Sequence, residues 1–374
     1  MITPYVTPTD LLGNPTAPPS INAASDAATL GVGFQTISEH RLWELCSIAT
    51  GRCDAFCGMT LRATSLYEEN SAPSHRVGQM GDYTTRFITS RKPIMAVVAG
   101  QWAFGGPPWT WNPIPLNQLA PQQPVMDDFG SGAWNGATSG MAAILIGNTG
   151  GLWNQGRNNT RIGLTYLAGW PHTGLVASAE QTVTLDDTVF TVTVSSATGI
   201  HPNAPVTGNG IPLNTTVSTV VGTTVTLSAK PTTNGSSVLF FGYPAGTSTF
   251  NVDDVTAWGL NIYGWLYDGQ NTEPIQSSSV VADTSGLVTP AGPGTITLAT
   301  ATLNAHLPGV AISALPQNIR WAAMLHVKCQ VLERGESALV AGSVPNRSGS
   351  TNRQRLGANL GEAERLLLPY RRTY

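Results

Sequence analysis

The chain has 374 residues and a net charge of -3, with 41% apolar residues and only 11% charged ones, against roughly 25% charged residues in a typical soluble domain. A monomer with so few charges would be poorly protected against association, so we expect neighbouring subunits to cover much of its surface. The first ten residues lack a signal-peptide pattern, and no apolar stretch reaches the roughly 18 residues of a membrane helix, so the composition predicts cytoplasmic assembly and no membrane span.

The first firm element follows an extended arm over residues 1–35, which is rich in Pro, Thr, Asn and Ala. Thr36 and Glu39 have capping-box spacing, which predicts a helix that begins here and ends at Cys57, before Gly58. Gly51 inside this helix argues against a single straight element. The apolar positions that recur at near-helical intervals are Ile37, Leu42, Leu45, Ala49, Cys53 and Phe56.

After a polar stretch that contains Glu68 and Glu69, the pattern changes to strands. Apolar and β-branched residues predict strands at Thr84–Thr89 and Ile94–Phe104. Pro93 lies between them and predicts a bend or a sheet edge.

Residues 105–158 form an unusually long stretch of Gly, Pro, Asn, Gln and Trp. Loops of this length are functional or disordered, and the many aromatic residues argue against disorder. We therefore expect an ordered extension, with a strand at Met141–Ile146, that docks onto a partner surface or onto the same chain. Trp109, Trp111 and Trp134 are the candidate residues for a subunit interface.

From Arg161 the pattern is that of a β protein, because short Thr- and Val-rich runs alternate with turn residues. Runs this short and evenly spaced predict a small barrel or Ig-like sandwich. The predicted strands are Arg161–Trp170; Thr182–Leu185, Phe190–Ser195, Thr216–Val221, Thr223–Leu227 and Val238–Phe241; and Thr249–Val252, Gly264–Tyr267, Pro274–Val281 and Gly294–Leu298.

The chain then returns to helix. Pro316 predicts a helix start and Gly335 its end, and apolar residues on almost every face predict that this helix is buried. A polar linker over 342–355 precedes a last helix that ends at Pro369. Residues 1–316 hold 10 basic and 18 acidic side chains, whereas residues 317–374 hold 9 and 4. This basic end predicts an acidic or nucleic-acid partner, or simply a solvated helix with scattered arginines.

Reactive and metal-binding patterns are missing from the sequence. Three of the four cysteines lie in the first predicted helix without zinc spacing, so all four are predicted to be buried thiols. His326 and Cys329 are one helical turn apart, but a lone pair does not fill a zinc site. No P-loop, GxSxG or HExxH motif is present.

Two adjacent carboxylate pairs, Asp186-Asp187 and Asp253-Asp254, are the only candidates for acid–base chemistry. Neighbouring side chains on a strand point to opposite faces, so neither pair converges on one substrate. Turn or strand-end roles are therefore favoured, with a weak cation site at Asp186 and Asp187 as the alternative. The sequence predicts a protein that is not an enzyme and that uses no metal or cofactor.

Four stretches, in this order, resemble the head-to-tail adaptor, or connector, proteins of siphophages, especially those infecting actinobacteria. They span more than half of the chain, whereas residues 105–158 and 181–242 depart from the family pattern. The stretches are Ala63–Glu69 with Thr85–Val97, which contains an Arg-x-Pro-Ile step; Leu164–Leu175, with a Tyr-x-x-Gly-x-Pro-x-Thr-x-Leu pattern; Phe250–Pro316, which leads into the Ala-rich helix; and Leu368–Arg372.

The resemblance implies an α+β fold in which N- and C-terminal helices form a small helical-bundle core and carry inserted β modules. The implied units are residues 1–35 (arm), 36–180 (core, first part), 181–245 and 246–315 (β modules) and 316–374 (core, second part). It also implies a structural virion protein of the phage neck. The subunits would form a dodecameric ring bound to the portal and to a stopper or tail-tube protein, and DNA would pass through its lumen.

In that setting the basic C-terminal tail is the candidate contact with portal or DNA. Arginine pairs with acidic portal residues or with phosphates, and flanking aromatic residues favour the portal. The candidate residues are Arg347, Arg353, Arg355, Tyr370, Arg371, Arg372 and Tyr374. The alternatives are a tail or decoration protein whose β modules bind host glycans, and another neck ring such as a stopper or tail terminator.

Overall fold

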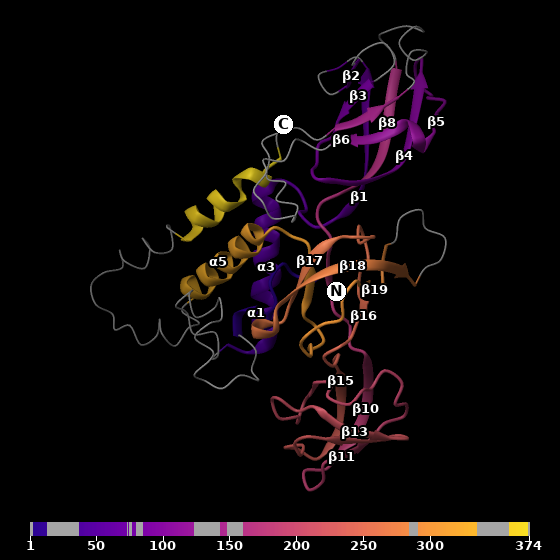
Figure 1. Cartoon of the computed structure of the whole chain (residues 1–374). Helices are drawn as coiled ribbons and strands as arrows, with labels where there is room; N and C mark the ends of the chain where they lie inside the picture. The colour runs from indigo at the N-terminus through magenta and orange to yellow at the C-terminus, as the bar shows by residue number, and fades with distance from the viewer. Residues whose placement is uncertain are drawn as a thin grey trace, which may run out of the picture.

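The computed structural model describes residues 3–12, 37–72, 74, 77–79, 85–122, 143–147, 160–283, 291–334 and 359–372. Strands are the commonest secondary structure, so the chain is an α+β protein that contains β modules. Figure 1 shows an elongated molecule with the helices and a six-stranded sheet in the middle and a β unit at either end. No helix in the described ranges is long and apolar enough to cross a bilayer.

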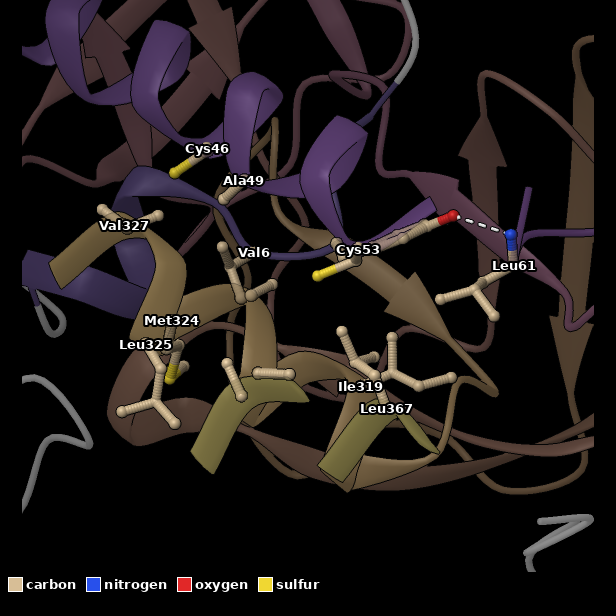
Figure 2. Packing of buried hydrophobic residues seen from close by; sticks show 14 of the residues in the cluster. Val6, Cys46, Ala49, Cys53, Leu61, Ile319, Met324, Leu325, Val327 and Leu367 are labelled. Carbon is tan, nitrogen blue, oxygen red and sulfur yellow. Dashed lines mark hydrogen bonds between the residues drawn. The ribbon is translucent and has the colours of Figure 1, made fainter. Parts of the chain in front are cut away.

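Helices from the two ends of the sequence share one hydrophobic cluster (Figure 2). They are α1 (Pro8–Leu12), α3 (Glu39–Cys57), α5 (Gln317–Arg334) and a helix over residues 359–367. The fully buried members labelled in Figure 2 are Val6, Cys46, Ala49, Cys53, Leu61, Ile319, Met324, Val327 and Leu367. The burial of these apolar side chains holds the two ends of the chain together.

The end of α3 follows the sequence pattern, but its start does not. The helix begins at Glu39 and its N-cap residue, Ser38, makes no side-chain hydrogen bond, while Thr36 lies outside the described residues. One helix continues through Gly51 to Cys57, although that glycine argued against a single straight element. At the other end Gly58 adopts a φ of 67°, and its N–H bonds to the carbonyl of Ala55. That left-handed conformation is favourable for glycine, which explains the stop.

Arg320 of α5 contacts both α1 and Tyr267. Helix α5 begins directly after Pro316, as predicted, and is buried around nearly its whole circumference. The Arg320 guanidinium forms a buried ion pair with Asp10 of α1 and lies 3.9 Å from the ring centroid of Tyr267. Asp10 also accepts a 2.8 Å hydrogen bond from the N–H of Thr7.

The first β unit consists of two four-stranded antiparallel sheets around one hydrophobic cluster. The first sheet has the order β1-β8-β4-β5 and the second β2-β3-β7-β6. The strands are β1 (Thr64–Ala72), β2 (Val77–Gln79), β3 (Thr85–Ile88), β4 (Ile94–Phe104), β5 (Asn112–Ile114), β6 (Leu119–Gln122), β7 (Ala143–Ile146) and β8 (Thr160–Ala168), and η3 (Leu116–Gln118) precedes β6.

One segment of this unit was misjudged from the sequence, and another agrees with it. The polar stretch around Glu68 is the nine-residue strand β1, paired along its whole length with β8. The expected ordered extension is confirmed over residues 112–122, which supply β5 and β6 to the two sheets of the same chain, and β7 matches the predicted strand Met141–Ile146. Residues 123–142 and 148–159 lie outside the described residues.

The second β unit, residues 179–241, has its own core between two three-stranded sheets. The first sheet has the order β10-β15-β12, and the second β11-β14-β13. Gly222, with a φ of 60°, allows the tight turn between β13 and β14. The strands are β10 (Ala179–Leu185), β11 (Thr191–Thr193), β12 (Val206–Gly208), β13 (Val217–Val221), β14 (Thr224–Leu227) and β15 (Gly235–Phe241).

A six-stranded sheet of order β16-β19-β18-β17-β20-β9 lies beside the helices. A bridge between Leu175 and Val252 links its two edges, so the sheet curls around a third hydrophobic cluster. The sequence indicated four of its strands and missed the two three-residue strands β9 and β20. The strands are β9 (His172–Gly174), β16 (Thr249–Val252), β17 (Tyr263–Tyr267), β18 (Glu273–Ala282), β19 (Gly294–Leu298) and β20 (Ala311–Ser313), with η4 (Gly269–Asn271) between β17 and β18.

Candidate functional site

Tyr370, one of the predicted contact residues, is part of the chain's own core. It lies in the short helix η5 (Leu368–Tyr370) and is 2% exposed. Its ring meets the Trp170 ring edge to face, with centroids 5.4 Å apart. Burial raises the pKa of Tyr370 to about 12, so the phenol is neutral at physiological pH. Tyr370 therefore anchors the C-terminal segment and is not exposed to a partner in this structure.

Arg371 and Arg372 follow this anchor at the C-terminal end of α3. The N–H of Arg372 donates a 2.8 Å hydrogen bond to the carbonyl of Cys57, one of the terminal carbonyls without an intrahelical partner. The Arg371 guanidinium is exposed and lies 5.8 Å from the ring centroid of Phe56. Its positive charge is favourable near the negative end of the helix dipole. The predicted contacts Arg347, Arg353, Arg355 and Tyr374 lie outside the described residues.

The predicted interface residue Trp109 belongs to a group of side chains on the first sheet, named here the Tyr67 patch (Tyr67, Glu69, Gln101, Trp109 and Arg161). The Arg161 guanidinium lies 4.9 Å from the Trp109 ring centroid and forms an ion pair with Glu69. Gln101 donates a 3.1 Å hydrogen bond to the Tyr67 hydroxyl. These contacts fix the side chains in one arrangement while Tyr67 remains 50% exposed.

The two other predicted interface tryptophans do not belong to this patch. Trp111 is half-buried beside β5, and Trp134 lies outside the described residues. Gly163 on β8 explains how the Tyr67 ring can lie close to the sheet, because a Cβ there would approach the Tyr67 hydroxyl to 2.4 Å. The structure therefore brings together Trp109 and four residues that the sequence reasoning did not select.

A second polar group that the sequence did not reveal is a buried network around His306. Its Nε2 lies 2.6 Å from Glu273 Oε1 and its Nδ1 lies 3.2 Å from Asp268 Oδ2. Glu273 also accepts the N–H of Leu303, and Asp268 accepts that of Leu307. His306 is fully buried, so this arrangement fixes the loop before β20 and is not accessible to a substrate. No local sequence motif joins the three residues, because His306 is 33 residues from Glu273 and 38 from Asp268.

The cysteines and carboxylate pairs occupy structural positions. All four cysteines are buried thiols, as predicted, and burial raises the pKa of the Cys57 thiol to about 12. Asp253 and Asp254 follow strand β16, and Asp186 follows β10 and accepts hydrogen bonds from Thr188. Within the described ranges, no three His, Cys, Asp or Glu side chains are grouped to hold a metal ion.

Comparisons with known proteins give no relative for this chain. No family model, no curated protein and no solved structure matches it.

Proposed function

We propose that the chain is a subunit of the head-to-tail adaptor ring of a tailed phage, located between the portal and the next neck protein and surrounding part of the DNA channel. The observation that supports this most is the shared core of α1, α3, α5 and residues 359–367. Both β units and the whole six-stranded sheet are inserted between α3 and α5 in the sequence. The helices would be the helical-bundle core that the resemblance implies, and the β units its accessories.

A ring would also explain the low charge of the chain. Only 11% of its residues are charged, which suits a protein whose surface is largely covered by neighbouring subunits. Head-to-tail contacts between identical subunits close into a ring when the rotation between subunits allows it. In this proposal the compact helical region supplies the side-by-side contacts, and the ring is dodecameric.

The C-terminal segment is the proposed portal contact. Tyr370 holds the segment in the core, and this places the exposed Arg371 guanidinium at the surface beside the end of α3. Arginine there would pair with portal carboxylates. Contact with DNA phosphates is the other outcome, and it is recognised by a steep dependence on salt concentration.

The structure allows a sharper experiment than removal of the whole tail. Truncation before residue 359 would remove Ala363, Leu367 and Tyr370 from the shared core. Arg371→Glu changes the charge without removing a core side chain. Arg365→Glu, on the last helix and 71% exposed, is the matched control. We expect Arg371→Glu to weaken portal binding about tenfold or more in a pull-down or interferometry measurement, and Arg365→Glu to leave it unchanged. Equal binding by both variants would refute the contact.

The Tyr67 patch favours a second candidate, a tail or decoration protein that binds glycans. A half-exposed Tyr67 ring beside Gln101 and the Arg161–Trp109 pair offers a flat apolar surface and hydrogen-bonding groups. This candidate predicts that the full chain binds host cell-wall glycans, that Tyr67→Ala abolishes binding and that Tyr263→Ala, at another exposed tyrosine, does not. A ring that binds portal but no glycan would exclude it.

A further inference from the structure

A polar cavity of about 320 Å³ lies between the N-terminal segment and the six-stranded sheet. This volume is at the lower end of the range for small-molecule sites, which runs from about 300 to 1,000 Å³. Residues from five separate parts of the sequence line it: Thr3, Arg62, His172, the segment with Asp253, Asp254 and Thr256, and Gly292.

Two of the lining side chains are fully engaged within the protein. His172 contacts Ser313 Oγ at 2.9 Å through Nδ1 and the Pro4 carbonyl at 3.0 Å through Nε2. Burial lowers the pKa of His172 to about 4, so the ring is neutral at physiological pH. Asp253 uses one oxygen for Thr173 and the other for Thr3. These groups form the walls of the cavity.

Only one of the two carboxylate oxygens of Asp254 accepts hydrogen bonds. Its Oδ1 accepts hydrogen bonds from the N–H and hydroxyl of Thr256 and from the N–H of Gly292. Among the described residues, Oδ2 of Asp254 has no hydrogen-bond partner, and neither has the Arg62 guanidinium; the two groups also form no ion pair with each other. The Arg62 charge also acts on Asp54 and His172. Its N–H donors and the second Asp254 oxygen can still form hydrogen bonds with a ligand.

We propose that this cavity binds a basic amino acid, either free or as the C-terminal residue of a peptide. Arg62 would bind the ligand's α-carboxylate through its planar set of N–H donors, and Asp254 would accept hydrogen bonds from a cationic group. The formal charges of the lining side chains Arg62, Asp253 and Asp254 sum to -1, which a ligand of charge +1 neutralises. This site is independent of ring assembly, so its failure would leave the adaptor proposal untouched.

Titration calorimetry of the full chain with L-arginine tests the proposal. We expect saturable binding that is at least about tenfold tighter than binding of agmatine, which keeps the guanidinium but lacks the carboxylate. A short peptide ending in arginine, compared with the same peptide amidated at its C-terminus, distinguishes the two sources of the ligand. The free-acid peptide binds only if the cavity accepts a chain end, whereas binding of L-arginine alone assigns the site to the free amino acid.

Two substitutions link binding to the cavity. Arg62→Gln removes the carboxylate-binding charge, so L-arginine should bind about tenfold more weakly and no better than agmatine. Asp254→Asn keeps an oxygen for Thr256 and Gly292 but removes the charge, so both ligands should weaken. Asp187→Asn, on an exposed loop, is the matched control, and unchanged thermal unfolding midpoints verify the folds. Absence of saturable binding, or equal affinity in Arg62→Gln and Asp187→Asn, overturns the proposal.

Discussion

The fully buried His306 imidazole, in the loop before β20, lies 2.6 Å from a carboxylate oxygen of Glu273 on β18. The His306 main chain also exchanges two hydrogen bonds with Tyr243, just after the 179–241 unit. The same residue therefore connects the loop before β20 to the point where the chain leaves that unit.

Removal of this imidazole should be strongly destabilising. His306→Leu leaves the carboxylates of Glu273 and Asp268 buried without their shared partner, which costs about 3–5 kcal/mol of unfolding free energy. His201→Leu, at an exposed histidine, should cost much less. Urea denaturation followed by tryptophan fluorescence measures both, and equal stability of the two variants would show that the network contributes nothing.

The Asp10–Arg320 pair should couple the N-terminal helix to α5. Arg320→Met leaves Asp10 buried and unpaired, and we expect a loss of about 3–5 kcal/mol in unfolding free energy. Adding Asp10→Asn should recover part of that loss, because the unpaired charge is removed. A double-mutant cycle measures this coupling, expected at about 0.5–3 kcal/mol. Strict additivity of the two substitutions would contradict a direct interaction.

Acid should destabilise the shared helical core through His326. Burial lowers the pKa of His326 in the folded state to about 4, below the ordinary value of 6.5. Between these values the unfolded chain binds more protons than the folded one, so stability falls as pH falls. Protonation of His326 should lower the free energy of unfolding by about 3 kcal/mol once the pH is below 4. His326→Leu should remove this loss, so the variant should become more stable relative to the wild type as the pH falls from 7 to 4. A pH-independent difference in unfolding free energy between the two proteins would contradict the assignment.

Two glycine substitutions should have opposite effects. Gly51 is inside α3 with open space around it, so Gly51→Ala should stabilise the protein by about 0.5–1 kcal/mol. Gly169 has a φ of +107°, and a Cβ there would lie 2.4 Å from the Arg62 carbonyl oxygen. Gly169→Ala should therefore be strongly destabilising. Thermal unfolding midpoints give the sign of each effect, and a lower midpoint for Gly51→Ala would refute the interpretation of α3.

Elements with a local signal were predictable from the sequence. Ile94–Phe104 and Gly294–Leu298 match the observed strands because their apolar patterns define them. Strand β1 was missed because its polar side chains find partners only in the folded chain, as when Glu68 accepts the N–H of Ser90. Strands β9 and β20 have only three residues, too few to show an alternating pattern.

The candidate site was harder to predict, because its residues are joined only by the fold. Tyr370 was selected as an exposed contact from its arginine neighbours, yet the aromatic ring fills the space beside Trp170. Conversely, Tyr67, Gln101 and Arg161 are part of a surface patch but were not selected, because they share no pattern in the sequence. They come together only through the pairing of β1 and β4 with β8.

Electron-microscopy class averages of the purified chain, with and without portal protein, test the central claim most directly. The account predicts closed rings with a central pore, formed by side-by-side contacts of the helical region and seated on the portal by the end that carries Arg371. Monomers at concentrations where portal is saturated, or rings that touch the portal only through the 179–241 unit, would contradict it.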